Sequence, residues 1–193
     1  MKHIIFYTCA AFLFSCNGNS NTDAVKKADS ANDARRDSND KSDGNAAILA
    51  DKTTSGFLVN ATDGGIMEVD LGNIAKEKAV NPRVKAFGEM MIADHTKAND
   101  QLKSLAGSRT VEIPTRVSDQ HAAMMAKINK ADAKHFDKMY IDLMVEDHKE
   151  DIKEFEDAEK KITDTAINRF ITQTLPVLRK HLDSCTAIQD SLK

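Results

Sequence analysis

Apolar side chains recur every three or four residues from residue 53 to residue 193, the spacing that places them on one face of an α-helix. Alternating β-type patterns and hairpin turn signals are almost missing from this region. We therefore predict four long helices and one short helix, over about residues 55–79, 82–106, 133–162 and 165–193 and, for the short one, 119–129. Residues 53–193 are expected to form one all-α domain, an antiparallel four-helix bundle with a short extra helix between two helix pairs.

Capping residues support these boundaries, because a side-chain oxygen just before a helix accepts hydrogen bonds from its first free N–H groups. The expected N-caps are Asn81 before Pro82, Ser118, Asp132, and either Thr163 or Asp164. Gly107 is the expected C-terminal cap of the second long helix. Glycines within a helix cost about 1 kcal/mol each relative to alanine. We expect those at positions 64, 65, 72 and 88 to mark close helix contacts, although the first two could instead break the first helix.

The first 52 residues follow a different pattern. Residues 1–15 place Lys2 and His3 before an apolar run, which is typical of a cleaved signal peptide and is shorter than the roughly 20 residues of a membrane span. Residues 16–52 consist mainly of Asn, Ser, Asp, Ala and Lys, and such a segment buries too little apolar surface to order itself. We predict a disordered tether of about 33 Å average span. A helix over residues 24–36 is an alternative, which its Asp, Ser and Asn residues disfavour.

The junction between these two segments resembles a lipoprotein processing site. Leu13-Phe14-Ser15-Cys16 is similar to the lipobox of bacterial lipoproteins, with an aliphatic residue three positions before the cysteine and a small one directly before it. The resemblance implies that the chain is cut before Cys16 and that its sulfur carries a diacylglyceryl group. Two or three acyl chains give stable anchoring, so the expected partner is a membrane and the expected location is the cell envelope, at the outer membrane. The alternative is an ordinary secreted protein with an incidental cysteine.

Composition narrows the remaining function classes. The chain has 27 Lys and Arg against 30 Asp and Glu, a formal charge of −3, with both signs interspersed, so nucleic acid is not an expected partner. Cys9 would leave with the signal peptide and Cys16 would carry lipid, which leaves Cys185 as a buried thiol and no disulfide in the mature chain. Phosphate-binding glycine loops, Cys-x-x-Cys pairs and nucleophile motifs are missing from the sequence. An enzyme is therefore the least favoured class.

A repeated motif places histidines on the core faces of two helices. Met91-Ile92-Ala93-Asp94-His95 corresponds to Met144-Val145-Glu146-Asp147-His148, and both histidines share a face with apolar neighbours. His181 lies beside the apolar stripe of the last helix, and Glu68 lies near the inner side of the first. Helical bundles build cofactor sites from one such side chain on each of four helices.

The domain as a whole resembles domain of unknown function 4142, a ferritin-like helical family of bacterial envelope proteins. The matching stretches are Gly64-Gly65-Ile66-Met67-Glu68, Asn81-Pro82-Arg83-Val84-Lys85, Asp94-His95, Phe136-Asp137-Lys138-Met139-Tyr140, Met144-Val145-Glu146-Asp147-His148, and Leu175-Pro176-Val177-Leu178 followed by His181-Leu182. They cover nearly all of residues 55–190 in order. The resemblance implies a ferritin-like bundle and an envelope location, and it implies no established activity.

Two interpretations of these histidines and acidic residues stay open at this point. In one, the bundle core binds zinc, copper or iron through imidazole and carboxylate ligands. The candidate ligands are Glu68, His95, His148 and His181, with Asp94 and Asp147 as hydrogen-bonding partners or alternative ligands. In the other, which the sequence favours, each histidine is hydrogen-bonded across helices to an acid or a carbonyl group, no cofactor is needed, and the domain is a non-enzymatic structural or binding module.

The pattern also limits the chemistry of any metal site. Ferritin-type di-iron sites need Glu-x-x-His on two helices, but Ile92 and Val145 occupy those glutamate positions here. Ferroxidase chemistry is therefore not expected from the fold alone. His121 and His135 are expected at the surface or as caps, and the charged run over residues 146–161 alternates in sign as a solvated helix face does.

Overall fold

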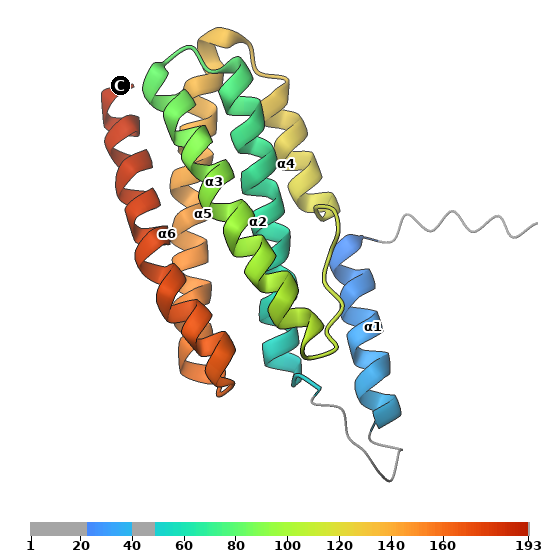
Figure 1. The fold of residues 1–193 in the computed structure, drawn as a ribbon. Helices are drawn as coiled ribbons and strands as arrows, with labels where there is room; N and C mark the ends of the chain where they lie inside the picture. The colour runs from blue at the N-terminus through green and yellow to red at the C-terminus, as the bar shows by residue number, and fades with distance from the viewer. Residues whose placement is uncertain (1–22, 40–48, 193) are drawn as a thin grey trace, which may run out of the picture.

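The computed structural model describes residues 23–39 and 49–192, which contain six α-helices and no β-strand (Figure 1). The helices are α1 (Ala24–Asn39), α2 (Lys52–Lys78), α3 (Pro82–Gly107), α4 (Asp119–Asn129), α5 (Ala133–Lys161) and α6 (Thr165–Ser191). The all-α prediction is confirmed. The expected signal peptide and Cys16 lie outside the described residues.

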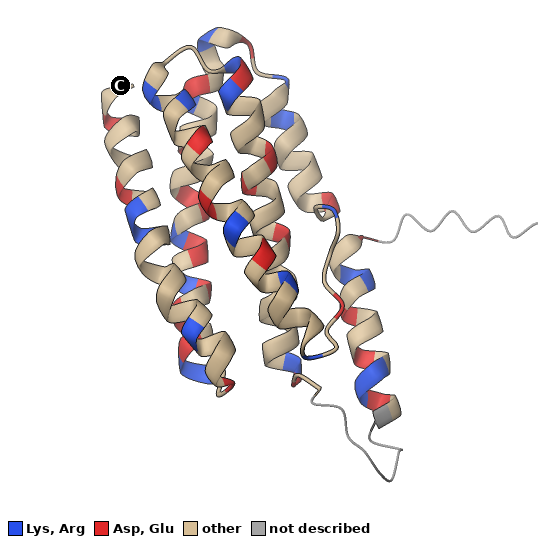
Figure 2. Ribbon diagram, in the orientation of Figure 1, with Lys and Arg blue, Asp and Glu red and all other residues tan. Residues whose placement is uncertain are grey.

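The four long helices lie side by side. The α2 helix packs along α3 and α5 along α6, and α2–α5 and α3–α6 contacts join the two pairs. The helices of each pair are antiparallel, whereas α3 and α5 run in the same direction, because the connection that carries α4 returns the chain to the far end (Figure 1). Basic and acidic residues are interspersed on the helices (Figure 2). Within the described ranges, no helix combines the length and the apolar character of a membrane span.

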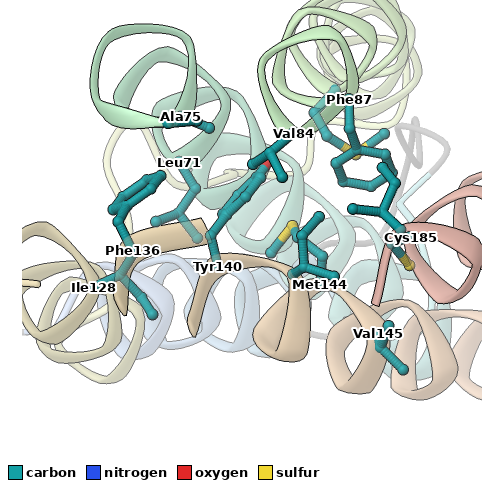
Figure 3. Packing of buried hydrophobic residues seen from close by; sticks show 14 of the residues in the cluster. Leu71, Ala75, Val84, Phe87, Ile128, Phe136, Tyr140, Met144, Val145 and Cys185 are labelled. Atoms are coloured by element: carbon teal, nitrogen blue, oxygen red, sulfur yellow. The ribbon is translucent and has the colours of Figure 1, made fainter. Parts of the chain in front are cut away.

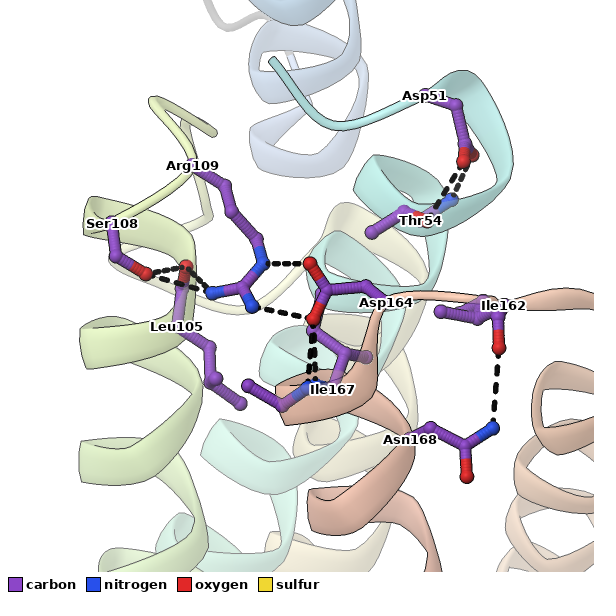
Figure 4. Close-up of polar contacts among 10 residues, drawn as sticks. Asp51, Thr54, Leu105, Ser108, Arg109, Ile162, Asp164, Ile167 and Asn168 are labelled. Atoms are coloured by element: carbon purple, nitrogen blue, oxygen red, sulfur yellow. Dashed lines mark hydrogen bonds and ion pairs between the residues drawn. The ribbon is translucent and has the colours of Figure 1, made fainter. Parts of the chain in front are cut away.

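The helices α3 to α6 begin where the sequence predicted, whereas α2 begins at Lys52, three residues before the expected start, with Asp51 as its N-cap. Asn81, Ser118, Asp132 and Asp164 are all N-caps, and Asp164 also accepts two hydrogen bonds from Arg109, of 2.8 and 2.5 Å, that join the start of α6 to the end of α3 (Figure 4). One detail of the capping differs. Gly107 is the last residue of α3 rather than its cap, and the left-handed backbone conformation falls on Thr110, with φ of 56°.

Two hydrophobic clusters fill the interior. Cluster A comprises Met67, Leu71, Ala75, Ala79, Val84, Phe87, Met91, Ile128, Phe136, Tyr140, Ile141, Met144, Val145, Cys185 and Ile188 (Figure 3). Cluster B comprises Phe57, Leu58, Leu102, Ala106, Phe155, Ala158, Ile162, Ile167, Phe170, Ile171, Leu175 and Leu178. Cys185 is fully buried with a free thiol, as expected. Along α3, α5 and α6 the two clusters leave an interval between them, and the histidines occupy it.

Two glycines allow α2 and α3 to approach closely. A Cβ atom added to Gly72 would lie 2.8 Å from the backbone oxygen of Gly88, and one added to Gly88 would lie 2.9 Å from that of Gly72. Gly65 faces Asn99 just as tightly, with 2.2 Å between a Cβ atom and the amide oxygen. These three positions confirm the expected close contacts. The alternative that Gly64 and Gly65 break the first helix is wrong, because α2 runs through both.

The segment that we expected to be a disordered tether contains α1. Ala24, Ala28 and Asn32 are buried on one face of this helix. The Asn32 side-chain amide donates to the backbone carbonyl of Glu112 at 2.9 Å and accepts from the backbone N–H of Glu112 at 2.7 Å. These two hydrogen bonds join α1 to the loop between α3 and α4. Arg36 also donates to the Ser55 hydroxyl of α2 at 2.8 Å. The helix is therefore held by polar contacts to distant residues rather than by a large apolar face.

Candidate metal centre

A polar layer crosses the core between clusters A and B. Each of the four long helices contributes one side chain to it: Glu68 from α2, His95 from α3, His148 from α5 and His181 from α6. Their exposed fractions are 1%, 6%, 0% and 0%. The structure thus brings together the four residues that the sequence singled out. Polar groups buried this deeply must be satisfied by hydrogen bonds or by a bound ion.

The outward-facing nitrogen of each imidazole has its own partner. Nδ1 of His148 lies 3.0 Å from the backbone oxygen of Met144, and since a carbonyl oxygen only accepts, this nitrogen carries the proton. Nδ1 of His95 lies 2.6 Å from Glu68 Oε2, and Nε2 of His181 lies 2.9 Å from Asp94 Oδ2. A carboxylate is likewise an acceptor. All three outward nitrogens therefore hold protons, and the inward nitrogen of a neutral ring is left with a lone pair.

These inward nitrogens converge. His181 Nδ1 lies 3.3 Å from His148 Nε2 and 3.4 Å from His95 Nε2. His148 Nε2 also lies 3.4 Å from Glu68 Oε1, which is buried and has no hydrogen-bond partner among the described residues. When His95 is charged, it carries a second proton on Nε2, and this proton points to His181 Nδ1 and not to His148. The lone pair of His148 Nε2 then still faces two acceptors with no proton between them.

Burial and the Glu68 carboxylate set the charges of this layer. Burial opposes ionisation of Glu68, but the charge and hydrogen bond of His95 outweigh it and lower the pKa of Glu68. Burial equally disfavours charged His95, but Glu68 outweighs it and raises the pKa of His95. Burial lowers the pKa of His148 and lowers that of His181 to about 4. His148 and His181 are therefore neutral near pH 7, the form in which imidazole binds metal.

A second set of potential ligands adjoins the first. Ligand atoms of Glu68, Asp147 and His148 lie within 4.8 Å of one another, as do those of His95, His148 and His181. Asp147 Oδ2 is buried without a hydrogen-bond partner. Burial, with the nearby charge of Glu68, raises the pKa of Asp147 to about 8. Asp94 and Asp147 therefore play different parts: Asp94 orients His181, whereas Asp147 adds a carboxylate beside His148.

Part of the charged run on α5 is not a solvated face. Lys153 and Asp157 form an exposed ion pair of 2.8 Å, as the sequence predicted. Asp147, Asp151 and Glu154, however, are only partly exposed and line a cleft against α2 and α4. Burial, with the charge of Glu68, raises the pKa of Asp151 well above its usual range. Sequence reasoning named Asp147 but missed Asp151 and Glu154, although the spacing of four and three residues places all three on one helix face.

The two remaining histidines of the domain differ from each other. His135 is 61% exposed beside Asp132, as expected for a surface position next to a cap. His121 has a side chain only 20% exposed, and its Nδ1 lies 3.0 Å from Asp63 Oδ2. Asp63 also accepts from the backbone N–H of Ser118 at 2.6 Å. Asp63 thus anchors the beginning of α4 to α2, and the expectation of a simple surface histidine is corrected for His121.

Fold and site together define an all-helical domain with a buried layer of three imidazoles and one carboxylate. The family model described as Domain of unknown function (DUF4142) matches residues 39–188, and the chain belongs to this family. No curated protein and no solved structure matches it.

Proposed function

We propose that the domain binds one divalent transition-metal ion in its core through His95, His148 and His181, with Glu68 as the carboxylate that holds His95. The observation that carries the proposal is the convergence of lone pairs: His148 Nε2 lies 3.3 Å from one acceptor nitrogen and 3.4 Å from an acceptor oxygen. Without a cation, this arrangement places like partial charges together in a buried site.

The distances suit a tetrahedral ion. Nitrogens at about 2.0–2.1 Å from a tetrahedral zinc ion lie about 3.3–3.4 Å from each other, and His181 Nδ1 lies 3.3 Å from His148 Nε2 and 3.4 Å from His95 Nε2. Three imidazole ligands suit zinc best, and copper or iron next. The protonated outer nitrogens, held by Glu68, Asp94 and the Met144 carbonyl, are the usual support of metal-binding histidines.

The arrangement supports a ferritin-like bundle as the framework of this site. A single long crossover that makes its second and third long helices parallel is the ferritin type of connection, and α3 and α5 have this relation (Figure 1). The Glu-x-x-His pairs of di-iron proteins are replaced by Ile92 and Val145. We therefore propose a mononuclear site on this framework.

A binding role rather than catalysis fits the surroundings of the site. The cavity beside Glu68 and His95 has a volume of about 20 Å³, which is room for about one water molecule and for no organic substrate. The ion would join three helices directly, and α2 through Glu68, and stabilise the fold across the polar layer.

For the whole chain, we propose an envelope lipoprotein held by acyl groups on Cys16, at the outer membrane. The support is the sequence alone, a short apolar run followed by Leu13-Phe14-Ser15-Cys16. Mass spectrometry of the protein from membrane fractions tests it. We expect a lipid-modified N-terminal peptide that begins at Cys16, and release of a Cys16→Ala variant from the membrane fraction. An unmodified Cys16 in the membrane-bound chain would refute it.

Metal binding is tested by titrating the purified, chelator-treated full chain with Zn²⁺ and measuring stoichiometry and thermal stability. We expect one ion per chain. At a free concentration 100 times Kd the gain is about 2.7 kcal/mol, which raises Tm by about 5–10 °C. His148→Ala should abolish both effects, whereas His135→Ala, at an exposed position, should retain them. If Zn²⁺, Cu²⁺ and Fe²⁺ all leave Tm and the metal content unchanged, the histidines are a structural hydrogen-bond network and the proposal fails.

A further inference from the structure

An acidic cleft lies beside the buried histidines. It has a volume of about 520 Å³ and opens between α2, α4 and α5, with the beginning of α1 at its rim. Among the described residues that line the cleft, Lys26 of α1 is the one lysine. Carboxylates from α5 line its wall: Asp147, Glu150, Asp151 and Glu154. Carboxylates therefore outnumber basic groups along the cleft, and one of them, Asp147, has a ligand atom within 4.8 Å of those of Glu68 and His148.

The cleft and the interior share a thin wall. Asp151 lines both the open cleft and the internal cavity of about 20 Å³ that contains Glu68 and His95. Gly64 lines the cleft and Gly65 the cavity, so that α2 offers no side chain at this point. A Cβ atom on Gly64 would lie 3.8 Å from Asp151 Oδ1, an ordinary contact distance, so that Asp151 is the side chain of α5 that faces α2 at this point.

Two sets of potential ligands span the same wall and share His148. The outer set is Glu68, Asp147 and His148, and the inner set is His95, His148 and His181. Two oxygens of the outer set, Glu68 Oε1 and Asp147 Oδ2, are buried without hydrogen-bond partners. Asp147 lines the cleft, whereas the three inner histidines do not. The outer set therefore connects the cleft with the inner set.

We propose that divalent transition-metal ions enter through this acidic cleft, bind first to the outer set of Glu68, Asp147 and His148, and pass from there to the inner set of three histidines. The proposal rests on the metal-binding function inferred above and adds the route. Carboxylate oxygens accept hydrated, harder cations, whereas imidazoles favour zinc, copper and iron. Since His148 belongs to both sets, the ion keeps a protein ligand throughout the transfer. Negative clefts raise the local cation concentration and the association rate by about 10- to 1000-fold.

Stopped-flow uptake of Co²⁺ by the full, chelator-treated chain tests the route, because tetrahedral Co²⁺ absorbs visible light and reports arrival at the inner set. The test variant carries Asp147→Asn and Asp151→Asn, which keep side-chain size. The matched control is Glu146→Gln, whose carboxylate is on the exposed side of α5, 69% exposed. We expect the double variant to take up Co²⁺ at least about tenfold more slowly, because the outer set loses its Asp147 ligand, and to reach the same final spectrum, because the inner set of three histidines is unchanged.

The outcomes separate the two proposals. If the wild type develops no Co²⁺ spectrum, the metal-binding function itself fails. If it does, and the double variant is slowed no more than Glu146→Gln, the function stands and the entry route is refuted. A slower double variant with an unchanged final spectrum supports the route.

Discussion

The hydrogen bond between Asp94 and His181 gives a sharp test of how the candidate centre is organised. Asp94 Oδ2 lies 2.9 Å from His181 Nε2 and holds the proton on that nitrogen, so that Nδ1 keeps its lone pair toward the centre. An Asp94→Asn change removes the charge and lets a donor amide face the same nitrogen. Losing such a partner of a metal-binding histidine costs about 10- to 100-fold in metal affinity.

The expected effect lies at the low end of this range, because Asp94 is 39% exposed and water screens its charge. We expect Asp94→Asn to weaken Zn²⁺ binding about tenfold, or about 1.4 kcal/mol, with the stoichiometry unchanged. Glu68→Gln should cost more than about 100-fold, because Glu68 is 1% exposed, supports His95 and is itself a proposed ligand of the outer set. Asp100→Asn, at an exposed position of the same helix as Asp94, is the matched control.

Competition against a chelator of known zinc affinity measures all three variants at one pH. An affinity of Asp94→Asn equal to that of Asp100→Asn would show that the bond to His181 does not organise the centre. A loss as large as that of Glu68→Gln would show that Asp94 binds the ion directly, which also refutes the assignment.

Three further predictions concern the framework. Gly72→Ala should destabilise the fold by about 1–3 kcal/mol in urea unfolding, because the new Cβ atom would lie 2.8 Å from the backbone of α3. The control Gly56→Ala lies on the same helix with open space around it and should stabilise the fold by about 0.5–1 kcal/mol. Equal effects of the two changes would contradict the close crossing of α2 and α3. Asn32→Ala should weaken the docking of α1 by about 2 kcal/mol, since two hydrogen bonds are lost. Amide hydrogen exchange should then accelerate in α1 alone. Unchanged exchange in α1 would refute the docking. The ion pair with Asp63 raises the pKa of His121 although burial opposes this, so the stabilisation is complete below about pH 6.5 and is lost as pH rises through the raised pKa. Tm should therefore fall over that range in the wild type and fall less in His121→Gln, where the raised pKa of His95 still contributes; parallel pH profiles would contradict this prediction.

The sequence predicted the long helices well because their signals are local. The N-caps Asn81, Ser118, Asp132 and Asp164 each act within three residues of themselves. Helix α1 was named only as a disfavoured alternative, because its buried face is made of two alanines and Asn32, whose partner lies 80 positions further along the chain. No local pattern identifies an asparagine that becomes buried only when a distant loop packs on it.

The candidate site shows the same division. The faces of His95, His148 and His181 follow from helical periodicity, so that their meeting was accessible from sequence. The partial burial of Asp151 was not accessible from sequence, because an aspartate among lysines and glutamates has the pattern of a solvated helix face. Asp151 is covered only because α2 has no side chain at Gly64, which it faces. Which side of a charged helix is covered depends on its neighbours rather than on its own residues.

The docking of α1 also bears on how far the domain could stand from a membrane. A free tether of 36 residues would average about 33 Å. With α1 held against the α3–α4 loop through Asn32, only the seven steps from Cys16 to Asp23 remain between a lipid anchor and the folded protein, at most about 25 Å when extended. Asp23 and Lys26 stand at the rim of the acidic cleft. In an anchored molecule the cleft would thus open close above the lipid headgroups, and ions would be drawn from the layer of solution at the bilayer surface rather than from the bulk.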